Sequence, residues 1–532
     1  MGQGQVLDPQ FGIDEPRGLR AGERIAQERE EPPGVRAVAE LRSRFHGSLH
    51  ERGGLECQLH DTAPHRLEAP RSRERKEAFV DSVADFVILC ERRGIRFARA
   101  TDYPDYYPER PGGKIGRAIE VEPFDTHRIG TWWETARAQD GVVFPLKTDD
   151  VWLLSRAWST PGGFVRGARF VGRAVAGAAQ RKKLVGAGAA LVCALLEVAL
   201  KQATPVWLSS PVEELVVDEG RVVGAAVRRG ERELRVRTRK GVVLAGGGFA
   251  HREDWREKYH GVPGYSSAIT GDQGSAIEVG QRAGGAVDLM DDAWWGASIP
   301  APGTDKSPAF LVGERSMPFS IIVDSQGERF VNESASYIDV GHRMLERAQA
   351  DRGPFWMISD ARHTRRYLRS FAVEPGATKA LREGGLLHKA DTLDALAVAI
   401  GLPPERLRAT VARFNGFART GVDQDFARGS SAYDRYYGDP LVRPNPNLGP
   451  LAKAPFTAVQ LVPGDLGTKG GLLTDEDGRV IREDGSPIEG LYASGNNTAS
   501  VMGNTYPGPG STLGPAAVFG LRAARHMAAQ RH

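Results

Sequence analysis

The sequence predicts an α/β protein in which a second, α+β domain interrupts a ligand-binding domain. Its 532 residues are about three times the length of a typical domain, so two domains sharing a large core are expected. The 64 glycines indicate many tight turns and close approaches of backbone to a ligand. A short apolar strand at 242–244 ends in three glycines, and strands with a glycine loop return at 470–497. This pattern is typical of a sheet that delivers backbone to a ligand.

Changes in composition and in apolar periodicity divide the chain into four segments. Residues 1–75 are rich in Arg, Glu, Pro and His and lack apolar periodicity, which predicts weak order. Residues 76–274 are expected to form the first part of the ligand-binding domain. Residues 275–440 form the inserted domain, and residues 441–532 complete the first one. A stretch rich in Pro, Asn and Gly at 436–450 is expected to link these last two segments.

Each element of the first part follows from a local pattern. Five residues at helical spacing predict a helix: Phe79, Val83, Phe86, Val87 and Cys90. The turn-rich DYPDYYPERPGG at 102–113 is expected to form a loop. Further elements expected from their patterns are a helix at about 188–203, a strand at 205–210, two strands joined by a turn at Glu219-Gly220, and the strand Val242, Val243, Leu244.

The inserted domain and the C-terminal segment show the same mixture of helix-like and strand-like patterns of apolar residues. Residues 274–287 and 390–402 read as helices, and 320–331 read as a hairpin around Ser325-Gln326-Gly327. Strands and turns follow at 470–497. The chain is expected to end in a helix from about Leu513 to Ala529.

Composition excludes several classes of protein. A formal net charge of +3, with both signs scattered along the chain, argues against nucleic acid as the main partner. The three cysteines have no metal-ligand spacing and favour a reducing compartment, the cytoplasm: they are Cys57, Cys90 and Cys193. The N-terminus lacks the features of a signal peptide. The apolar run from Leu184 to Leu200 is short and carries Glu197, so it is interpreted as a buried helix and not as a membrane span.

A glycine-rich turn near the C-terminus has its own physical interpretation. The strand from Gly490 to Ala493 runs into Ser494-Gly495-Asn496, where backbone dipoles can meet the oxygens of a cofactor. Ser511, Thr512 and Leu513 then open the last helix, whose N–H groups and positive dipole end can stabilise negative charge. The alternative is an ordinary capped helix after a turn.

Four segments together resemble the 3-oxosteroid 1-dehydrogenases, within the wider fumarate-reductase-like flavoproteins. They are GLYASGNNTASVMGNTYPGPGSTLGPAAVFG at 490–520, DYPDYYPERPGG, GVVLAGGGF, and IIVDSQGERFVNESASY at 321–337. The resemblance implies a Rossmann-like FAD-binding domain with an inserted α+β substrate domain. It also implies that residues of the glycine turns and of the last helix contact FAD: Gly246, Gly247, Gly495, Asn496, Ser511, Thr512 and Leu513.

The resemblance further implies a ketone as substrate. The wider group carries Arg and His near the C-terminal loop for a dicarboxylate, whereas here the loop reads Thr505-Tyr506-Pro507-Gly508-Pro509-Gly510. Removing hydrogens from carbons 1 and 2 of a 3-ketosteroid requires a base, a hydride acceptor and donors for the enolate oxygen. By resemblance, the donors are the hydroxyl of Tyr506 and the backbone N–H of Gly510.

The same resemblance assigns the base to Tyr337 in NESASY. A free phenol has a pKa near 10, so a neighbour must lower that pKa or relay the proton. The family's helper tyrosine falls in DYPDYYPE; Tyr106 is favoured over Tyr107. Taken singly, each tyrosine could simply pack its ring. Four residues could wall a flat apolar pocket or equally belong to the core: Trp294, Trp295, Phe319 and Met344.

One expected feature of the family is not found. A Gly-x-Gly-x-x-Gly turn between a first strand and helix should seat the pyrophosphate of FAD. Gly2-Gln3-Gly4 lacks the preceding strand, and Gly186-Ala187-Gly188 has Leu191 in place of the third glycine. The FAD-binding domain therefore looks incomplete at its N-terminus.

Three hypotheses remain. The chain is a steroid dehydrogenase, another flavin oxidoreductase of the wider group, or a non-catalytic remnant that binds steroid without redox chemistry. For the first, the expected partners are a steroid and an external electron acceptor such as a quinone. No transmembrane segment is expected, and peripheral contact with a membrane is left open. The oligomeric state is not predicted.

Overall fold

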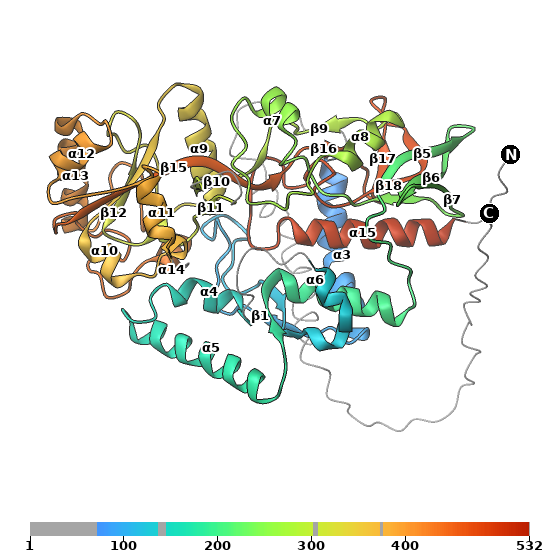
Figure 1. The fold of residues 1–532 in the computed structure, drawn as a ribbon, viewed down its shortest axis with the longest axis horizontal. Coiled ribbons are helices and arrows are strands. Elements are labelled where there is room, and N and C mark those ends of the chain that lie inside the picture. The colour runs from blue at the N-terminus through green and yellow to red at the C-terminus, as the bar shows by residue number, and fades with distance from the viewer. Residues whose placement is uncertain (1–71, 137–144, 302–306, 373–375, 531–532) are drawn as a thin grey trace.

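A computed structural model describes residues 72–136, 145–301, 307–372 and 376–530. Figure 1 shows two bodies joined through the long strand β15 and its neighbour β10. One body carries β5 to β8 and β16 to β18, and the other carries helices α9 to α14 around a second sheet. The predicted weak order of residues 1–71 lies outside the described residues. Helix α3 (Ser72–Arg92) begins four residues before the expected boundary at 76.

The first body is built on a small sheet with the strand order β17 (Arg479–Ile481), β18 (Pro487–Ala493), β8 (Val242–Leu244). β18 and β8 run parallel, with Ala493 opposite Leu244 at their carboxyl ends. Both strands therefore stop at the same edge of the sheet, where each is followed by glycines. This edge is where the two predicted glycine loops meet.

An antiparallel sheet lies beside it, formed by β5 (Val212–Asp218), β6 (Arg221–Arg229) and β7 (Arg232–Arg237). The predicted turn at Glu219-Gly220 is present, with φ of 46° and 80°. Two successive positive φ values are what a two-residue hairpin turn needs. The strand expected at 205–210 is wrong, because those residues are irregular, with one bend at Leu208-Ser209 and no partner strand among the described residues. Val206, Trp207 and Leu208 are exposed.

Helices cover the first body. The last helix, α15 (Leu513–Ala529), has the predicted bounds and packs on α3. The predicted apolar helix is α6 (Ala187–Lys201), which begins after the two-residue strand β4 (Leu184–Val185). β4 pairs antiparallel with β3 (Phe124–Asp125) and stands apart from the β8–β18 sheet, so the Gly186-Ala187-Gly188 turn is not a nucleotide-binding unit.

The second body is a six-stranded antiparallel sheet centred on β15 (Phe456–Thr468). The first half of β15 pairs with β13 and β14, and its second half pairs with β10. The other strands are β10 (Ala293–Ile299), β11 (Ala309–Phe310), β12 (Ser320–Val323), β13 (Phe355–Ser359) and β14 (Leu387–Ala390). The inserted sheet thus includes β15, which lies beyond the boundary expected at 440. The expected hairpin at 320–331 is reduced to a single bridge between Val323 and Arg329.

The remaining elements connect or cover these sheets. They are β1 (Phe97–Arg99), β2 (Ile119–Val121), the 3₁₀ helix η1 (Thr126–Thr135), α4 (Thr148–Leu154), α5 (Pro161–Ala179), α7 (Glu253–His260), α8 (Ser275–Arg282), β9 (Val287–Asp288), η2 (Glu314–Ser316), α9 (Tyr337–Gln349), α10 (Ala361–Arg366), η3 (Ser370–Ala372), α11 (Ala377–Glu383), α12 (Leu393–Ala399), α13 (Pro404–Thr420), α14 (Ala432–Tyr437) and β16 (Gly471–Leu472). In the part of the chain that the structure describes, no helix combines the length and the apolar composition required to cross a bilayer.

Candidate active site

The carboxyl ends of β8 and β18 are held together by hydrogen bonds. Ser494 donates its backbone N–H to the carbonyl of Leu244 at 3.0 Å, and Asn497 donates its side-chain amide to the same oxygen at 3.0 Å. Gly247 and Gly495, just beyond the strands, have φ of 79° and 86°. Glycine adopts this region at no steric cost, so both chains can turn back sharply beside one space.

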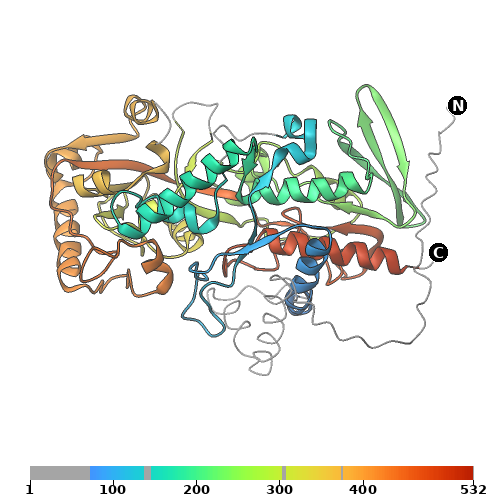
Figure 2. The same ribbon diagram turned by 90° about the horizontal axis from the view of Figure 1, so that it is seen from below.

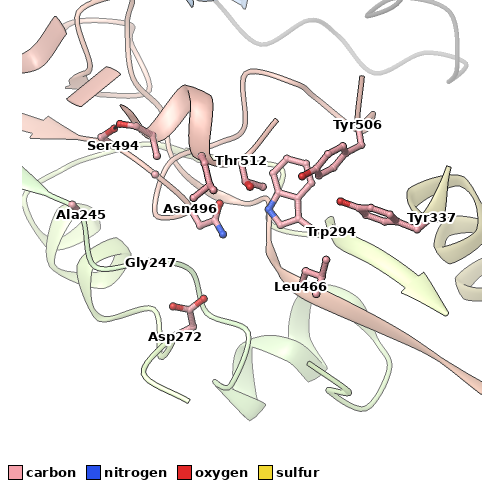
Figure 3. A pocket seen from close by; sticks show the side chains of 13 residues that line it. Ala245, Gly247, Asp272, Trp294, Tyr337, Leu466, Ser494, Asn496, Tyr506 and Thr512 are labelled. Carbon is pink, nitrogen blue, oxygen red and sulfur yellow. Dashed lines mark hydrogen bonds between the residues drawn. The ribbon is translucent and has the colours of Figure 1, made fainter. Parts of the chain in front are cut away.

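That space is a cavity of about 350 Å³ between the two bodies, shown in Figure 3. Its walls come from the β8 and β18 loops, β10, α9, the end of β15 and the start of α15. The lining residues are Ala245, Gly247, Asp272, Trp294, Tyr337, Leu466, Ser494, Gly495, Asn496, Tyr506, Thr512, Leu513 and Ala516. Such a mixture of apolar walls with a few polar groups is usual for a cofactor or small-molecule site.

Three predicted catalytic tyrosines meet at one end of this cavity. The rings of Tyr337 and Tyr506 have centroids 5.1 Å apart. Tyr106 stacks on Tyr506 at 5.0 Å and meets Tyr337 edge-on at 5.4 Å. Figure 3 shows the hydroxyls of Tyr337 and Tyr506 pointing the same way, toward the indole of Trp294. Segments more than a hundred residues apart thus present two hydroxyls to one space.

The neighbouring Tyr107 has a different direction. Its hydroxyl donates to Oδ1 of Asp339 at 3.0 Å, two residues along α9 from its first residue, Tyr337. Tyr106, in contrast, places its ring against both other tyrosines. The geometry therefore favours Tyr106 as the helper, and its role stays a prediction.

Burial dominates the electrostatics of the tyrosines. It raises the pKa of Tyr337 and Tyr106 well above the usual value, and it also raises the pKa of Tyr506. Neighbouring tyrosines add to this effect for Tyr337, because a second phenolate close by is unfavourable. All three side chains are therefore neutral phenols at neutral pH, suited to donating hydrogen bonds.

The structure also places the other predicted residues. Five of the seven expected FAD contacts line the cavity, and the two that do not are Gly246, which lies against Ala276, and Ser511, whose hydroxyl donates to the carbonyl of Gly508. Gly510 has a φ of 93° and adjoins the lining residues Thr512 and Leu513. Thr512 and Leu513 bring the N-terminus of α15 to the cavity wall, and no side chain caps that end, so the positive end of the helix dipole lies beside the cavity.

Sequence patterns gave no reason to select several of the lining residues. Leu466 reaches the cavity from the end of β15, and Asp272 reaches it from a loop that lies against Gly247. Of the four aromatic and apolar residues that could have walled a pocket, only Trp294 lines this one; Trp295, Phe319 and Met344 are buried in the core. The alternation of side chains along β10 was the available signal, since it sends Trp294 and Trp295 to opposite faces.

The residues around the cavity fit the ring end of FAD. A Cβ at Gly495 would come no closer than 3.8 Å to any protein atom, so the turn borders open space and not packed protein. The backbone of both glycine turns and the start of α15 can meet a flavin's polar edge, and Trp294 and Leu466 provide apolar contact. The described residues contain no strand, Gly-x-Gly-x-x-Gly turn and helix for the pyrophosphate.

Comparison with known proteins accounts for this arrangement. Residues 55–513 match the FAD binding domain family. The 3-oxosteroid 1-dehydrogenase of Mycolicibacterium smegmatis is 44% identical over 480 residues, which cover 86% of this chain and 83% of that protein. The chain belongs to the 3-oxosteroid 1-dehydrogenase family. Membership confirms the predicted fold class and FAD as the cofactor.

Two further proteins are similar to this chain, one known from a crystal structure and one from its sequence. The crystal structure of 3-ketosteroid Δ1-dehydrogenase from Sterolibacterium denitrificans, in complex with 1,4-androstadiene-3,17-dione, superposes with a TM-score of 0.80 at 33% identity, covering 94% of this chain and 89% of that one. A 4-oxocyclohexanecarboxylate 2-dehydrogenase of Sinomonas cyclohexanicum is 35% identical over 89% of this chain and 83% of its own length. The chain is thus a flavoprotein oxidoreductase among ketone dehydrogenases.

Proposed function

We propose that this chain introduces a double bond between carbons 1 and 2 of a 3-ketosteroid. The observation that carries the proposal is the meeting of Tyr337 and Tyr506 with the two glycine turns around one cavity. The names of the steroid dehydrogenases to which the chain is similar support the substrate class.

The roles of the residues follow from the chemistry. The Tyr506 hydroxyl and the Gly510 N–H donate hydrogen bonds to the ketone oxygen, which stabilises the enolate. This polarisation acidifies carbon 2, and the phenolate form of Tyr337 takes its proton. Tyr106 packs on both rings and fixes their separation. FAD, when bound beside the Gly247 and Gly495 turns, supplies the acceptor for the hydride from carbon 1.

Anaerobic titration tests the proposal. The purified chain, reconstituted with FAD, is mixed with androstenedione, with 4-oxocyclohexanecarboxylate or with reduced dye plus fumarate. We expect androstenedione alone to bleach the flavin and to yield the 1,4-dien-3-one. Bleaching by the cyclohexanone alone would favour a second ketone dehydrogenase function. A protein that binds steroid without flavin absorbance would be the non-catalytic remnant.

The electrons must leave the reduced enzyme, and we propose that this protein acts in the cytoplasm and passes them to a quinone or similar acceptor. Such acceptors and steroids both partition into bilayers, so the outer face of α5 becomes relevant. Phe164 is 67% and Val175 is 62% exposed on this helix, and Trp158 just before it is 62% exposed. Figure 1 shows α5 along the lower edge of the molecule, and Figure 2 shows the teal helices in front when seen from below.

Charge on α5 favours an anionic bilayer as the partner of this face. Arg166 pairs with Asp102 and Arg173 pairs with Asp150 of α4, so these two cations are neutralised by neighbouring segments. Arg169 is exposed among the apolar residues, and Arg181 and Lys182 follow the helix end. An amphipathic helix with an apolar face and flanking cations typically lies at a membrane surface.

Co-sedimentation with vesicles tests this contact. We expect the protein to bind vesicles containing phosphatidylglycerol more strongly than vesicles of phosphatidylcholine. Phe164→Glu should reduce that binding several-fold. The matched control is Val398→Glu, which alters a 70%-exposed valine on α12, and it should leave binding unchanged. Equal loss in both variants, or no binding by the native protein, would reject the α5 surface.

A further inference from the structure

A fully enclosed lysine lies directly behind the cavity wall. Lys469 follows β15 and is 1% exposed. Its Nζ donates to the carbonyls of Gly503 at 3.0 Å and Thr505 at 3.3 Å. Nζ also lies 4.7 Å from the ring centroid of Trp294. Lys469 thus contacts both the loop that carries Tyr506 and a residue that lines the cavity.

Packing alone does not explain a cation at this position. Burial lowers the pKa of Lys469, because removing an ammonium group from water is costly. A buried ion pair is often no more stable than apolar side chains of similar volume. An apolar residue would fill the space, so the charge and its three N–H donors point to another role.

Asp292 provides the counter-charge and extends the network. Its Oδ2 lies 3.3 Å from Nζ of Lys469, and its Oδ1 lies 2.8 Å from Nε2 of His342 on α9. Burial by itself would raise the pKa of Asp292, but Lys469 and His342 together lower it to about 2. The carboxylate is therefore charged at any working pH, and it links the Tyr506 loop to the helix that begins with Tyr337.

The position of Lys469 relates it to the enolate. The carbonyls of Gly503 and Thr505 lie just before Tyr506, so fixing them fixes the backbone that presents its hydroxyl. The Trp294 ring stands edge-on to Tyr506 with centroids 5.1 Å apart, and it is contacted by Nζ. A positive charge one ring away from the cavity favours negative charge on a ketone oxygen held there.

We propose that Lys469 is a positioning residue for the reaction. It anchors the Tyr506 loop through two hydrogen bonds and biases the ketone end of the cavity toward an enolate. This inference rests on the proposed function. Its two parts are separable, because Lys469→Gln keeps N–H donors but loses the charge, and Lys469→Met loses both.

The test uses a phenolic steroid as a mimic of the enolate. The carbon that bears the hydroxyl is labelled with ¹³C, and its chemical shift in the complex with the FAD-loaded protein reports the ratio of phenolate to phenol. We expect this ratio at fixed pH to fall about tenfold in Lys469→Gln and further in Lys469→Met, equivalent to about 1.4 kcal/mol per tenfold change. The steroid dissociation constant should change far less than the rate of carbon 2 proton exchange.

A matched control and the contrary outcomes complete the design. Lys240 also donates its ammonium group to a backbone carbonyl, that of Gln530, at the far end of α15, so Lys240→Met should leave the ratio unchanged. An unaltered ratio in Lys469→Met would overturn the inference. If that variant does not fold, Lys469→Gln decides in the same way. Native protein that binds the phenol but does not oxidise androstenedione would contradict only the proposed function.

Discussion

The ketone end and the nucleotide end of the cavity differ in how many of the expected structural elements are present among the described residues. At the ketone end, rings from three distant segments converge, and a buried ion pair supports the loop between them. At the nucleotide end, β8 is paired on one side only, with β18, among the described residues. Val243 on this strand is partly exposed. The tyrosines of the chemical end are all in place, whereas in the described part of the chain the sheet that should hold the nucleotide ends at β8.

This difference separates catalysis from cofactor retention. Changes at the tyrosine end should alter chemical steps while FAD content stays constant. Changes at the glycine turns should alter FAD affinity first, because the described residues offer no pyrophosphate seat to hold the nucleotide independently. Measuring both quantities in each variant shows whether the two ends act separately.

The largest effect is expected at the base. Tyr337→Phe removes the hydroxyl that takes the carbon 2 proton and keeps the ring contacts with Tyr106 and Tyr506. Exchange of that proton with deuterium from solvent should become undetectable, with FAD content unchanged. Mass spectrometry of recovered androstenedione measures it. Exchange at the native rate would assign the base to another group.

A smaller loss is expected at the oxyanion donor. Tyr506→Phe leaves the stacked ring but removes one hydrogen bond to the developing enolate, which typically costs about 10²–10³ in turnover. Anaerobic flavin reduction by androstenedione gives the rate. The control is Tyr259→Phe, a tyrosine on α7 that packs against Phe249 away from the three catalytic rings. Equal rates in Tyr506→Phe and native protein would remove this residue from the mechanism.

The sequence predicts the local features of this site better than its long-range ones. The turn at Glu219-Gly220, strand β8 and helix α15 each follow from a few adjacent residues. The contact of Tyr106 with Tyr337 does not, since it depends on how two bodies pack. Lys469 was missed for the same reason: one lysine between Thr468 and Gly470 carries no pattern until its carbonyl partners are in place.

Errors in the fold have related causes. Residues 205–210 have the apolar character of a strand, but no strand of the described residues pairs with them, so they stay irregular and largely exposed. The segment 436–450 has the composition of a linker, yet Asp439, Asn447 and Leu448 within it are fully buried. Composition reports local flexibility, whereas burial depends on what the rest of the chain places nearby.

The dependence of carbon 2 proton exchange on pH tests whether Tyr337 acts as a phenolate. Burial raises the pKa of Tyr337 well above its usual value, so the phenolate fraction is small at neutral pH. Since a raised pKa means the basic form appears only as pH rises, carbon 2 exchange should increase about tenfold per pH unit from pH 7 to 9 without a plateau. Exchange rates in buffered deuterium oxide give the slope. A flat profile would mean that the proton leaves Tyr337 through a relay in the same step.

The smallest effect is expected at the glycine turn, and it tests the nucleotide end. Gly495→Ala places a Cβ at a φ of 86° beside the cavity, and Gly485→Ala does the same at 80° in the turn between β17 and β18. Both variants should lose roughly 1–2 kcal/mol of stability from the left-handed backbone. Only Gly495→Ala should weaken FAD binding, by about tenfold, because Gly495 lines the cavity and Gly485 does not. Titration of flavin fluorescence measures the dissociation constants, and thermal unfolding measures the shared strain. Equal FAD affinities in the two variants would mean that the Gly495 turn does not hold the cofactor.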